Sequence, residues 1–379
     1  MKYQAKHVLS FLAVVSMSLI VASSIFPIID VAYPQTTALP DTWKSVAPMP
    51  TARAQLGVAV ANGKIYAIGG SANDPQGGPA VLNVTEEYNP GTNTWTTKAS
   101  MPTARHSFGI AVFQDKIYCM GGSTNGPVLA VNEVYDPATD TWETKTPMHT
   151  ARAALSTNTV NGKIYLMGGN PENTTNEVYD PVSDSWTTGA QIPLAPVYSE
   201  SAVVGGKIYL FGGLSNLNAT QIYNPETDTW TSGAPLPTGS AEGAAAATEG
   251  VNAPVRIYVM GGQTTFIRNG YTYGNITHLN QVYDPESNTW TRGASLPIQL
   301  WSFGLTNVND TFYAIGGFPK LIDFLNTNYQ YTPIGYGNPG GEPSSSLQDH
   351  LLVAIVVAAV TVVAVVVLIR YRKRVSKSF

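Results

Sequence analysis

The apolar residues of this 379-residue chain form a pattern that recurs six times. In each unit, alternating apolar residues lead into an Ile-Tyr or Phe-Tyr pair, and two consecutive glycines follow four residues after that pair begins. Period-two alternation with β-branched and aromatic residues is typical of strands. The glycine pairs are Gly69-Gly70, Gly121-Gly122, Gly168-Gly169, Gly212-Gly213, Gly261-Gly262 and Gly316-Gly317. Successive pairs are 52, 47, 44, 49 and 55 residues apart, which is the period of one four-stranded blade of a β-propeller.

Turn and aromatic landmarks complete each unit. Two-residue turns of the kind that tolerates positive φ precede the second strand in four units, at Asn62-Gly63, Gln114-Asp115, Asn161-Gly162 and Gly205-Gly206. A Tyr-Asx-Pro step then predicts a turn between the third and fourth strands, and a tryptophan follows seven residues after its tyrosine. These tryptophans, which we expect to fill the wedge between blades, are Trp95, Trp142, Trp186, Trp230 and Trp290. From about Asp41 to Pro333 the chain resembles the kelch-repeat β-propeller family, and this resemblance implies an all-β fold.

The sixth unit lacks its last strand, and a spare strand lies near the start of the chain. No tryptophan follows Tyr331 at the expected spacing, whereas Asp41-Thr42-Trp43 repeats the pattern of Asp140-Thr141-Trp142. A propeller closed by pairing its two ends leaves no open sheet edge. The sequence therefore predicts a six-bladed propeller over residues 36–333, with the Trp43 strand completing the sixth blade.

Two apolar runs flank the predicted propeller and predict a membrane topology. Residues 1–26 are typical of a secretory signal peptide, with an uncleaved signal anchor as the alternative. Residues 334–349, rich in Gly, Pro and Ser, predict a stalk, and the uncharged run within 350–370 is long enough for a transmembrane helix. The basic tail 371–379 favours a cytoplasmic C-terminus. We therefore expect a single-pass protein of the cell membrane, anchored through its C-terminal helix, with the propeller outside.

Composition narrows the expected partners. Once the two lysines near the start and the five basic residues after Ile369 are set aside, 14 Lys and Arg remain against 25 Asp and Glu, which argues against nucleic acid as a ligand. The only cysteine, Cys119, excludes an intrachain disulfide. Five Asn-X-Ser/Thr sequons are candidate glycosylation sites of an extracellular domain, at Asn83, Asn173, Asn218, Asn275 and Asn309.

The sequence carries no recognisable catalytic or metal-binding motif. No cluster of His, Cys and carboxylates has metal-ligand spacing, and no nucleophile elbow, phosphate loop or dinucleotide fingerprint is present, so we expect neither a metal nor a cofactor. These absences favour a binding protein over an enzyme without deciding between them, because acid/base work on a sugar needs only one or two well-placed side chains.

Candidate ligand-binding residues lie where the innermost strands begin, since propellers present ligands at the mouths of the central channel. Aligning the units places six residues at this level: Gln55, Ser107, Ala154, Tyr198, Glu242 and Ser302. The resemblance to kelch domains implies that these positions read the ligand. Two residues earlier, Arg53, Arg105 and Arg152 occupy half of the ring, and either a structural or a ligand-binding role is open to them.

The other half of the ring departs from the repeat at Tyr198, Glu200, Glu242 and Trp301. Trp301 has no counterpart in the other units, so it is either an aromatic platform for a ligand or a space-filling residue beside Leu300. Three functions follow as hypotheses. The first is a cell-surface recognition module that binds an extracellular protein segment or glycan at one channel mouth. The second is a carbohydrate-active enzyme of the mutarotase or epimerase kind, with Glu200 or Glu242 as base beside Arg105 or Arg152. The third is a structural surface protein without a ligand site.

Overall fold

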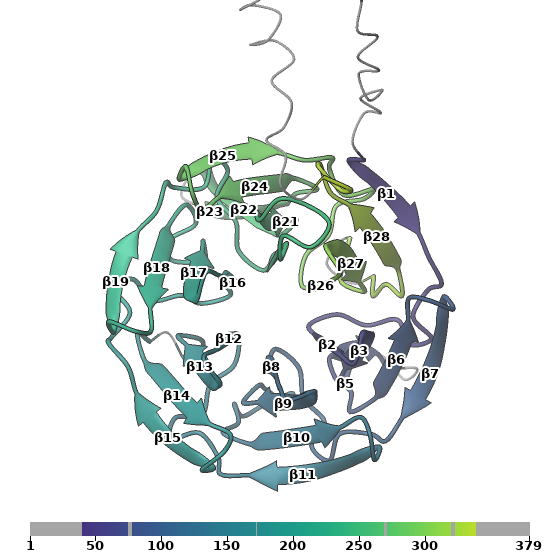
Figure 1. Cartoon of the computed structure of the whole chain (residues 1–379). Helices are drawn as coiled ribbons and strands as arrows, with labels where there is room; N and C mark the ends of the chain where they lie inside the picture. The colour runs from purple at the N-terminus through teal and green to yellow at the C-terminus, as the bar shows by residue number, and fades with distance from the viewer. Residues whose placement is uncertain (1–39, 75–77, 172, 269–270, 320–322, 339–379) are drawn as a thin grey trace, which may run out of the picture. The chain divides into compact units, whose positions relative to one another are not determined.

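A computed structural model describes residues 40–338, apart from 75–77, 172, 269–270 and 320–322. The chain divides into two units, Met1–Leu39 and Pro40–Phe379, and all described residues belong to the second. They form six four-stranded antiparallel sheets arranged as blades around a central channel (Figure 1). The predicted six-bladed, all-β propeller is confirmed.

Each blade is built from four strands that run from the channel to the outer rim. From inside to outside, the first three blades are β2 (Gly57–Ala61), β3 (Lys64–Ile68), β6 (Thr85–Asn89) and β7 (Thr94–Lys98); β8 (Gly109–Phe113), β9 (Lys116–Met120), β10 (Asn132–Asp136) and β11 (Thr141–Lys145); β12 (Ser156–Val160), β13 (Lys163–Met167), β14 (Asn176–Asp180) and β15 (Ser185–Thr188). The next two are β16 (Glu200–Val204), β17 (Lys207–Phe211), β18 (Thr220–Asn224) and β19 (Thr229–Ser232); β20 (Ala244–Ala247), β21 (Ile257–Met260), β24 (Asn280–Asp284) and β25 (Thr289–Arg292). The sixth is β26 (Gly304–Val308), β27 (Thr311–Ile315), β28 (Asn328–Thr332) and β1 (Thr42–Ser45). Two accessory hairpins, β4 (Ser71–Asn73) with β5 (Pro79–Val81) and β22 (Gln263–Arg268) with β23 (Tyr271–Ile276), follow the glycine pairs of blades one and five.

The sixth blade closes the propeller by joining the two ends of the domain. Strand β1 pairs antiparallel with β28, with Thr42 opposite Thr332 and Trp43 opposite Tyr331. The Trp43 ring stacks on the Tyr331 ring with centroids 4.8 Å apart, and its Nε1 donates a hydrogen bond of 2.9 Å to the Ala294 carbonyl of blade five. The predicted closure by the Trp43 strand is confirmed.

The wedge between blades is filled by buried tyrosines, against which the repeat tryptophans pack as partly buried residues of the same clusters. The third-strand tyrosines Tyr88, Tyr135 and Tyr331 are at most 1% exposed and pack into clusters that combine residues of adjacent blades. Each repeat tryptophan is only half-buried on its outermost strand, opposite its own tyrosine, as Trp95 is opposite Tyr88. The indole N–H reaches the preceding segment, so that Trp95 donates to the Ala47 carbonyl at 2.8 Å. The tryptophans therefore link adjacent blades at the rim through these hydrogen bonds from the outermost strands.

Several predictions fall outside the described residues or on the propeller surface. Residues 1–26, the transmembrane segment 350–370 and the tail 371–379 lie outside the described residues, as does most of the stalk 334–349. Between residues 40 and 338, as far as they are described, no helix is long and apolar enough to cross a membrane. Among the sequons, Asn275 and Asn309 are exposed, Asn173 is half-buried, and the amides of Asn83 and Asn218 donate to the carbonyls of Met101 and Leu236.

Candidate ligand site at the channel mouth

Six residues close one end of the channel with a continuous ring of backbone hydrogen bonds. Each N–H donates to the carbonyl of the residue one blade earlier, over 2.7–3.1 Å, and the first donates to the last. All six adopt a positive φ between 50° and 58°, which turns each backbone toward its neighbour as the chain enters the innermost strand. The members are Gln55, Ser107, Ala154, Tyr198, Glu242 and Ser302. The structure thus brings together the six positions that alignment of the repeats selected, and we call them the mouth ring.

The mouth ring encircles a shallow depression of about 140 Å³. Its wall alternates ring residues with the residues that follow them, including Leu56, Phe108, Leu155 and Phe303. The volume is below the roughly 300–1,000 Å³ of a small-molecule pocket. A depression of this size fits one side chain of a larger ligand, with the surrounding loops contacting the rest.

The polar groups of the mouth ring are neutral or acidic. Ser302 Oγ donates to Glu242 Oε2 at 2.9 Å, and Ser71 Oγ donates to Gln55 Oε1 at 3.0 Å. Burial raises the pKa of the Glu242 carboxyl, and burial together with the Glu242 charge raises the pKa of the Tyr198 phenol. No lysine or arginine lines the depression. This surface favours ligand groups that donate hydrogen bonds.

Glu200, predicted at the mouth, lies beneath it. The side chain is 3% exposed and occupies the first position of β16, where the other inner strands begin with Gly, Ser or Ala. Its Oε1 accepts hydrogen bonds from Ser240 Oγ and Gly243 N, both at 2.8 Å, whereas Oε2 is buried without a partner. Burial raises the pKa of this carboxyl to about 7, against the opposing effect of the Ser240 hydrogen bond.

The arginines predicted beside the mouth are internal structural groups. Arg53, Arg105 and Arg152 are fully buried, and their guanidinium groups pair with Glu86, Glu133 and Glu177 at 2.8, 2.5 and 2.6 Å. The same guanidinium groups donate to backbone carbonyls, such as Arg105 to Cys119 at 2.9 Å. Among the described residues, no arginine forms an ion pair with Glu200 or Glu242. The constellation of Glu200, Glu242 and an arginine that a sugar-active enzyme would need is therefore not assembled.

Glu86, Glu133 and Glu177, the partners of the three arginines, were not predicted from the sequence, although their position in the repeat could have indicated them. They stand two residues before the third-strand tyrosine. Where the arginine is replaced by Pro196 or Ser240, the same position holds Gln221 or Gln281, and where it is replaced by Leu300 it holds Tyr329. The Gln281 amide bonds the N–H and carbonyl of Thr238, both at 2.9 Å. Among the repeats of this chain, the arginine position and the third-strand glutamate position are thus either both charged or both uncharged.

Trp301 lies one residue before the ring and packs against blade six. Its ring centroid is 4.8 Å from that of Phe318, which in turn contacts Phe324 at 4.7 Å. The indole is partly exposed, but its Nε1 is buried without a hydrogen-bond partner. Within the described part of the chain, no group of three or more His, Cys, Asp and Glu side chains could hold a metal ion.

Comparisons with known proteins agree with this architecture. The kelch motif matches residues 52–102, 104–149, 151–192, 195–237 and 256–297, more than half of the chain, so the chain belongs to the kelch-repeat β-propeller family. Human Kelch-like protein 28 is 33% identical over 97 residues, which cover 25% of this chain and 16% of that protein. The human influenza virus NS1A-binding protein is 40% identical over 80 residues, covering 21% and 12%. The chain thus aligns with less than a fifth of the length of these relatives.

Among solved structures, that of YjhT superposes with a TM-score of 0.64 at 15% identity and covers 75% of this chain and 95% of its own. At this identity the likeness concerns the fold alone. Kelch propellers generally bind proteins, and what the comparisons establish for this chain is membership of that family.

Proposed function

We propose that this protein is a cell-surface recognition module that binds an extracellular protein segment at the mouth ring. The observation that carries the proposal is the ring itself, because six residues with five kinds of side chain are held by one backbone hydrogen-bond circuit on a rigid scaffold. A preformed backbone lowers the ordering cost of binding. The ring residues can vary without altering the circuit, because only their main-chain atoms take part in it.

The extracellular setting rests on the sequence. The uncharged run Leu351–Ile369 is followed at once by five basic residues, and an apolar segment precedes the propeller. Protease added to intact cells should remove the propeller and leave a membrane fragment bearing Phe379; a protected propeller would reverse the topology.

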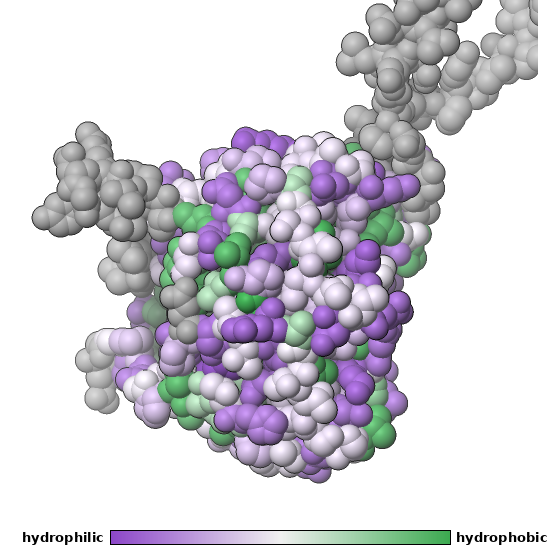
Figure 2. Space-filling view, turned by 90° about the vertical axis from the view of Figure 1, so that its left-hand side faces the viewer, coloured by the Kyte–Doolittle hydropathy of each residue, from purple (hydrophilic) through white to green (hydrophobic). Residues whose placement is uncertain are grey.

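The rim of the propeller carries a pocket of about 440 Å³ beside β18 and β19, so the choice of the mouth rests on the ring and not on a featureless rim. Figure 2 looks onto the blades drawn at the left of Figure 1, around β15 and β19, and shows hydrophilic residues interspersed with small, separate hydrophobic ones. A broad apolar patch, which would mark an interaction surface, is not seen on this described face.

The test is selection of peptides from a phage-displayed 12-residue library against the full chain in detergent, with a glycan array in parallel. Tyr198→Ala and Glu242→Ala should weaken the selected peptides by about fivefold or more each, as expected for interface anchors worth about 1 kcal/mol. Ala154 already occupies an equivalent ring position at φ 54°, so both variants should fold. Glu143→Gln on the exposed outermost strand β11 is the control and should leave peptide binding unchanged.

Two results would refute the proposal. Peptide binding that survives both ring substitutions would place the site elsewhere, and retention on glycans with no peptide selected would identify a carbohydrate-binding protein.

A further inference from the structure

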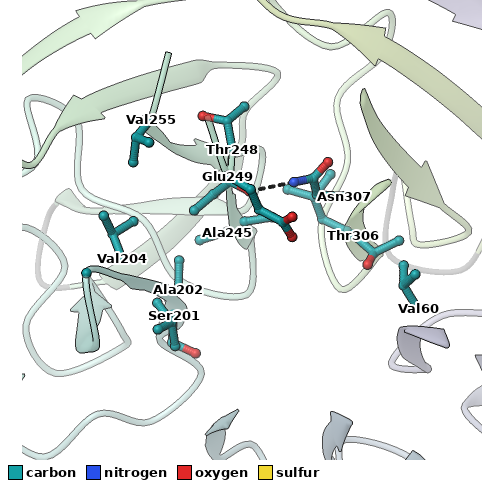
Figure 3. A pocket seen from close by; sticks show the side chains of 15 residues that line it. Val60, Ser201, Ala202, Val204, Ala245, Thr248, Glu249, Val255, Thr306 and Asn307 are labelled. Atoms are coloured by element: carbon teal, nitrogen blue, oxygen red, sulfur yellow. Dashed lines mark hydrogen bonds between the residues drawn. The ribbon is translucent and has the colours of Figure 1, made fainter. Parts of the chain in front are cut away.

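The end of the channel opposite the mouth ring contains a larger cavity, of about 540 Å³. It lies along the later residues of β16, β20 and β26 and is bordered by Val60 of β2 (Figure 3). The inner strand β20 contributes Ala245–Ala247; at the positions of Ala245 and Ala247 the other inner strands have Val, Ile, Thr or Leu, apart from Ser201 and Asn307. These small side chains leave space for the cavity, and the volume of the cavity falls within the range of ligand pockets.

An extended hairpin loop forms one side of this cavity. The ring residue of blade five lies 19 residues before its glycine pair, at Glu242 and Gly261, whereas Gln55 lies 14 residues before Gly69. The extra residues belong to segment 248–256 between β20 and β21, where each of the five other blades has a two-residue turn. This segment places Thr248, Glu249 and Val255 on the cavity wall.

The loop is fixed by a buried carboxylate from the neighbouring blade. Asp310 is 0% exposed, and its oxygens accept hydrogen bonds from the backbone N–H groups of Glu249 and Asn252, both at 2.5 Å, and of Ala253 at 3.0 Å. The Asn252 amide also donates to the Asn309 carbonyl at 3.0 Å. Glu249 therefore stands on a backbone that is held in place before any ligand arrives.

The polar groups of the cavity offer unused acceptors and one negative charge. Glu249 is exposed and forms no ion pair within the described part of the chain, and it is the sole ionisable residue among those lining the cavity. Asn307 Nδ2 donates to the Ala247 carbonyl at 2.9 Å, which leaves its buried Oδ1 without a partner. The Thr248 hydroxyl is already engaged with Pro254 and Arg256. In Figure 3 the Glu249 carboxylate points toward the side of the cavity formed by Thr306 and Asn307.

From this arrangement we infer a second binding site, specific for an alkylammonium group. The ammonium carries three N–H donors and a positive charge, which match the Glu249 carboxylate, and a turn of the Asn307 side chain on binding would bring its unpartnered Oδ1 to the same group. The alkyl part lies against Ala245, Val204 and Leu305, which line the cavity. The group belongs either to a free aliphatic amine or to a lysine side chain of a bound protein. This site is independent of the mouth ring, which lies at the other end of the inner strands.

The test measures binding of n-propyl-, n-pentyl- and n-heptylammonium to the full chain in detergent by calorimetry at pH 7. Affinity should rise by up to about fourfold per added methylene while the chain stays within the cavity. Glu249→Gln should weaken each probe by about tenfold, and n-pentanol should not compete. Ala245→Leu, which fills the cavity and keeps the carboxylate, should abolish binding, whereas Tyr198→Ala at the mouth ring should not change it.

Each outcome bears on the inference. Equal binding of n-pentanol and n-pentylammonium, or an unchanged affinity in a folded Glu249→Gln variant, would overturn it. A capped Gly-Lys-Gly peptide separates the two sources: binding at least as tight as that of n-pentylammonium identifies a lysine side chain, and exclusion of the peptide identifies a free amine. The melting temperature of each variant shows that loss of binding is not loss of fold.

Discussion

The three buried Arg–Glu pairs predict a double-mutant result for which the chain itself supplies the template. In blade two, Arg105 is 0% and Glu133 3% exposed at the side chain, so removing one partner leaves a buried charge with no counter-charge. Blade five places Gln281 where blade two has Glu133, and blade six places Leu300 where blade two has Arg105. The combination Arg105→Leu with Glu133→Gln therefore uses side chains that the same framework already accepts.

The expected magnitudes follow from burial. Each single substitution, Glu133→Gln or Arg105→Leu, should cost about 3–5 kcal/mol of unfolding free energy, because breaking a fully buried pair costs that much. The double variant should recover at least half of this loss, since the glutamine amide introduced by Glu133→Gln can bond the Thr103 backbone as Gln281 bonds Thr238. The coupling energy should then be about 2 kcal/mol or more, within the range seen for directly interacting residues.

The assay is urea unfolding followed by tryptophan fluorescence, with thermal melting beside it. The matched control is Glu143→Gln, because the Lys145–Glu143 pair is 23% and 63% exposed and should contribute less than about 1 kcal/mol. If Glu133→Gln costs no more than Glu143→Gln, or if the two single costs simply add in the double variant, the pair is not the structural unit described here.

Three further predictions concern single residues. The folded pKa of Glu200 is raised from 4.5 to about 7, so the protonated carboxyl contributes its full stability below pH 4.5, and about 3 kcal/mol of unfolding free energy is lost as pH rises to 7. Glu200→Gln should therefore flatten the dependence of the melting temperature on pH between pH 5 and 8 and raise the melting temperature at pH 8. An unchanged slope would contradict this. Asp310 has the opposite sign: although burial alone would raise its pKa, backbone N–H groups of the loop hold it below the usual value, so stability is lost as pH falls through that lowered pKa. Asp310→Asn should cost about 1–3 kcal/mol and speed hydrogen exchange in 249–253, and unaltered exchange there would argue against the anchor. Trp43→Ala, which removes the stack on Tyr331, should cost about 3 kcal/mol and promote aggregation on heating, and an unchanged melting temperature would show that the β1 strand is not needed for closure.

The fold was predictable because its signals are local and repeated. The Gly-Gly pairs all have positive φ in both residues, so their spacing marks equivalent points of each blade. The displaced Trp43 was sufficient to predict closure, because the sixth repeat lacks a tryptophan and the segment before the first repeat has one to spare. A single strand that carries Trp43 accounts for both. The tryptophans do pack against the clusters between blades, but the repeat shows only which aromatics recur and not that the facing tyrosine is the inner residue of each pair.

The site was predictable in its backbone and less so in its side chains. The six ring positions follow from where the inner strands begin, but their hydrogen-bond circuit joins residues of successive blades, and finally Gln55 to Ser302, and is visible only in three dimensions. The direction in which a side chain leaves the first residue of a strand depends on the neighbouring blade. Glu200 was therefore placed at the mouth, although Ser240 and Gly243 hold it inside. The cavity at the far end depends on a loop insertion whose partner, Asp310, lies in another blade.

The pairing of β1 with β28 also constrains how the protein can be made. Asp41 and Tyr331, which share a hydrogen bond in the finished sheet, are 290 residues apart in the chain. At roughly 5–20 residues per second, synthesis of the intervening chain takes about 15–60 s, during which β1 has no strand to pair with. Its sequence, Thr-Trp-Lys-Ser, carries one aromatic among three polar residues, which keeps the waiting strand soluble. The first strand synthesised is thus the last to be folded, and the ribosome must deliver almost the whole propeller before its sixth sheet can exist.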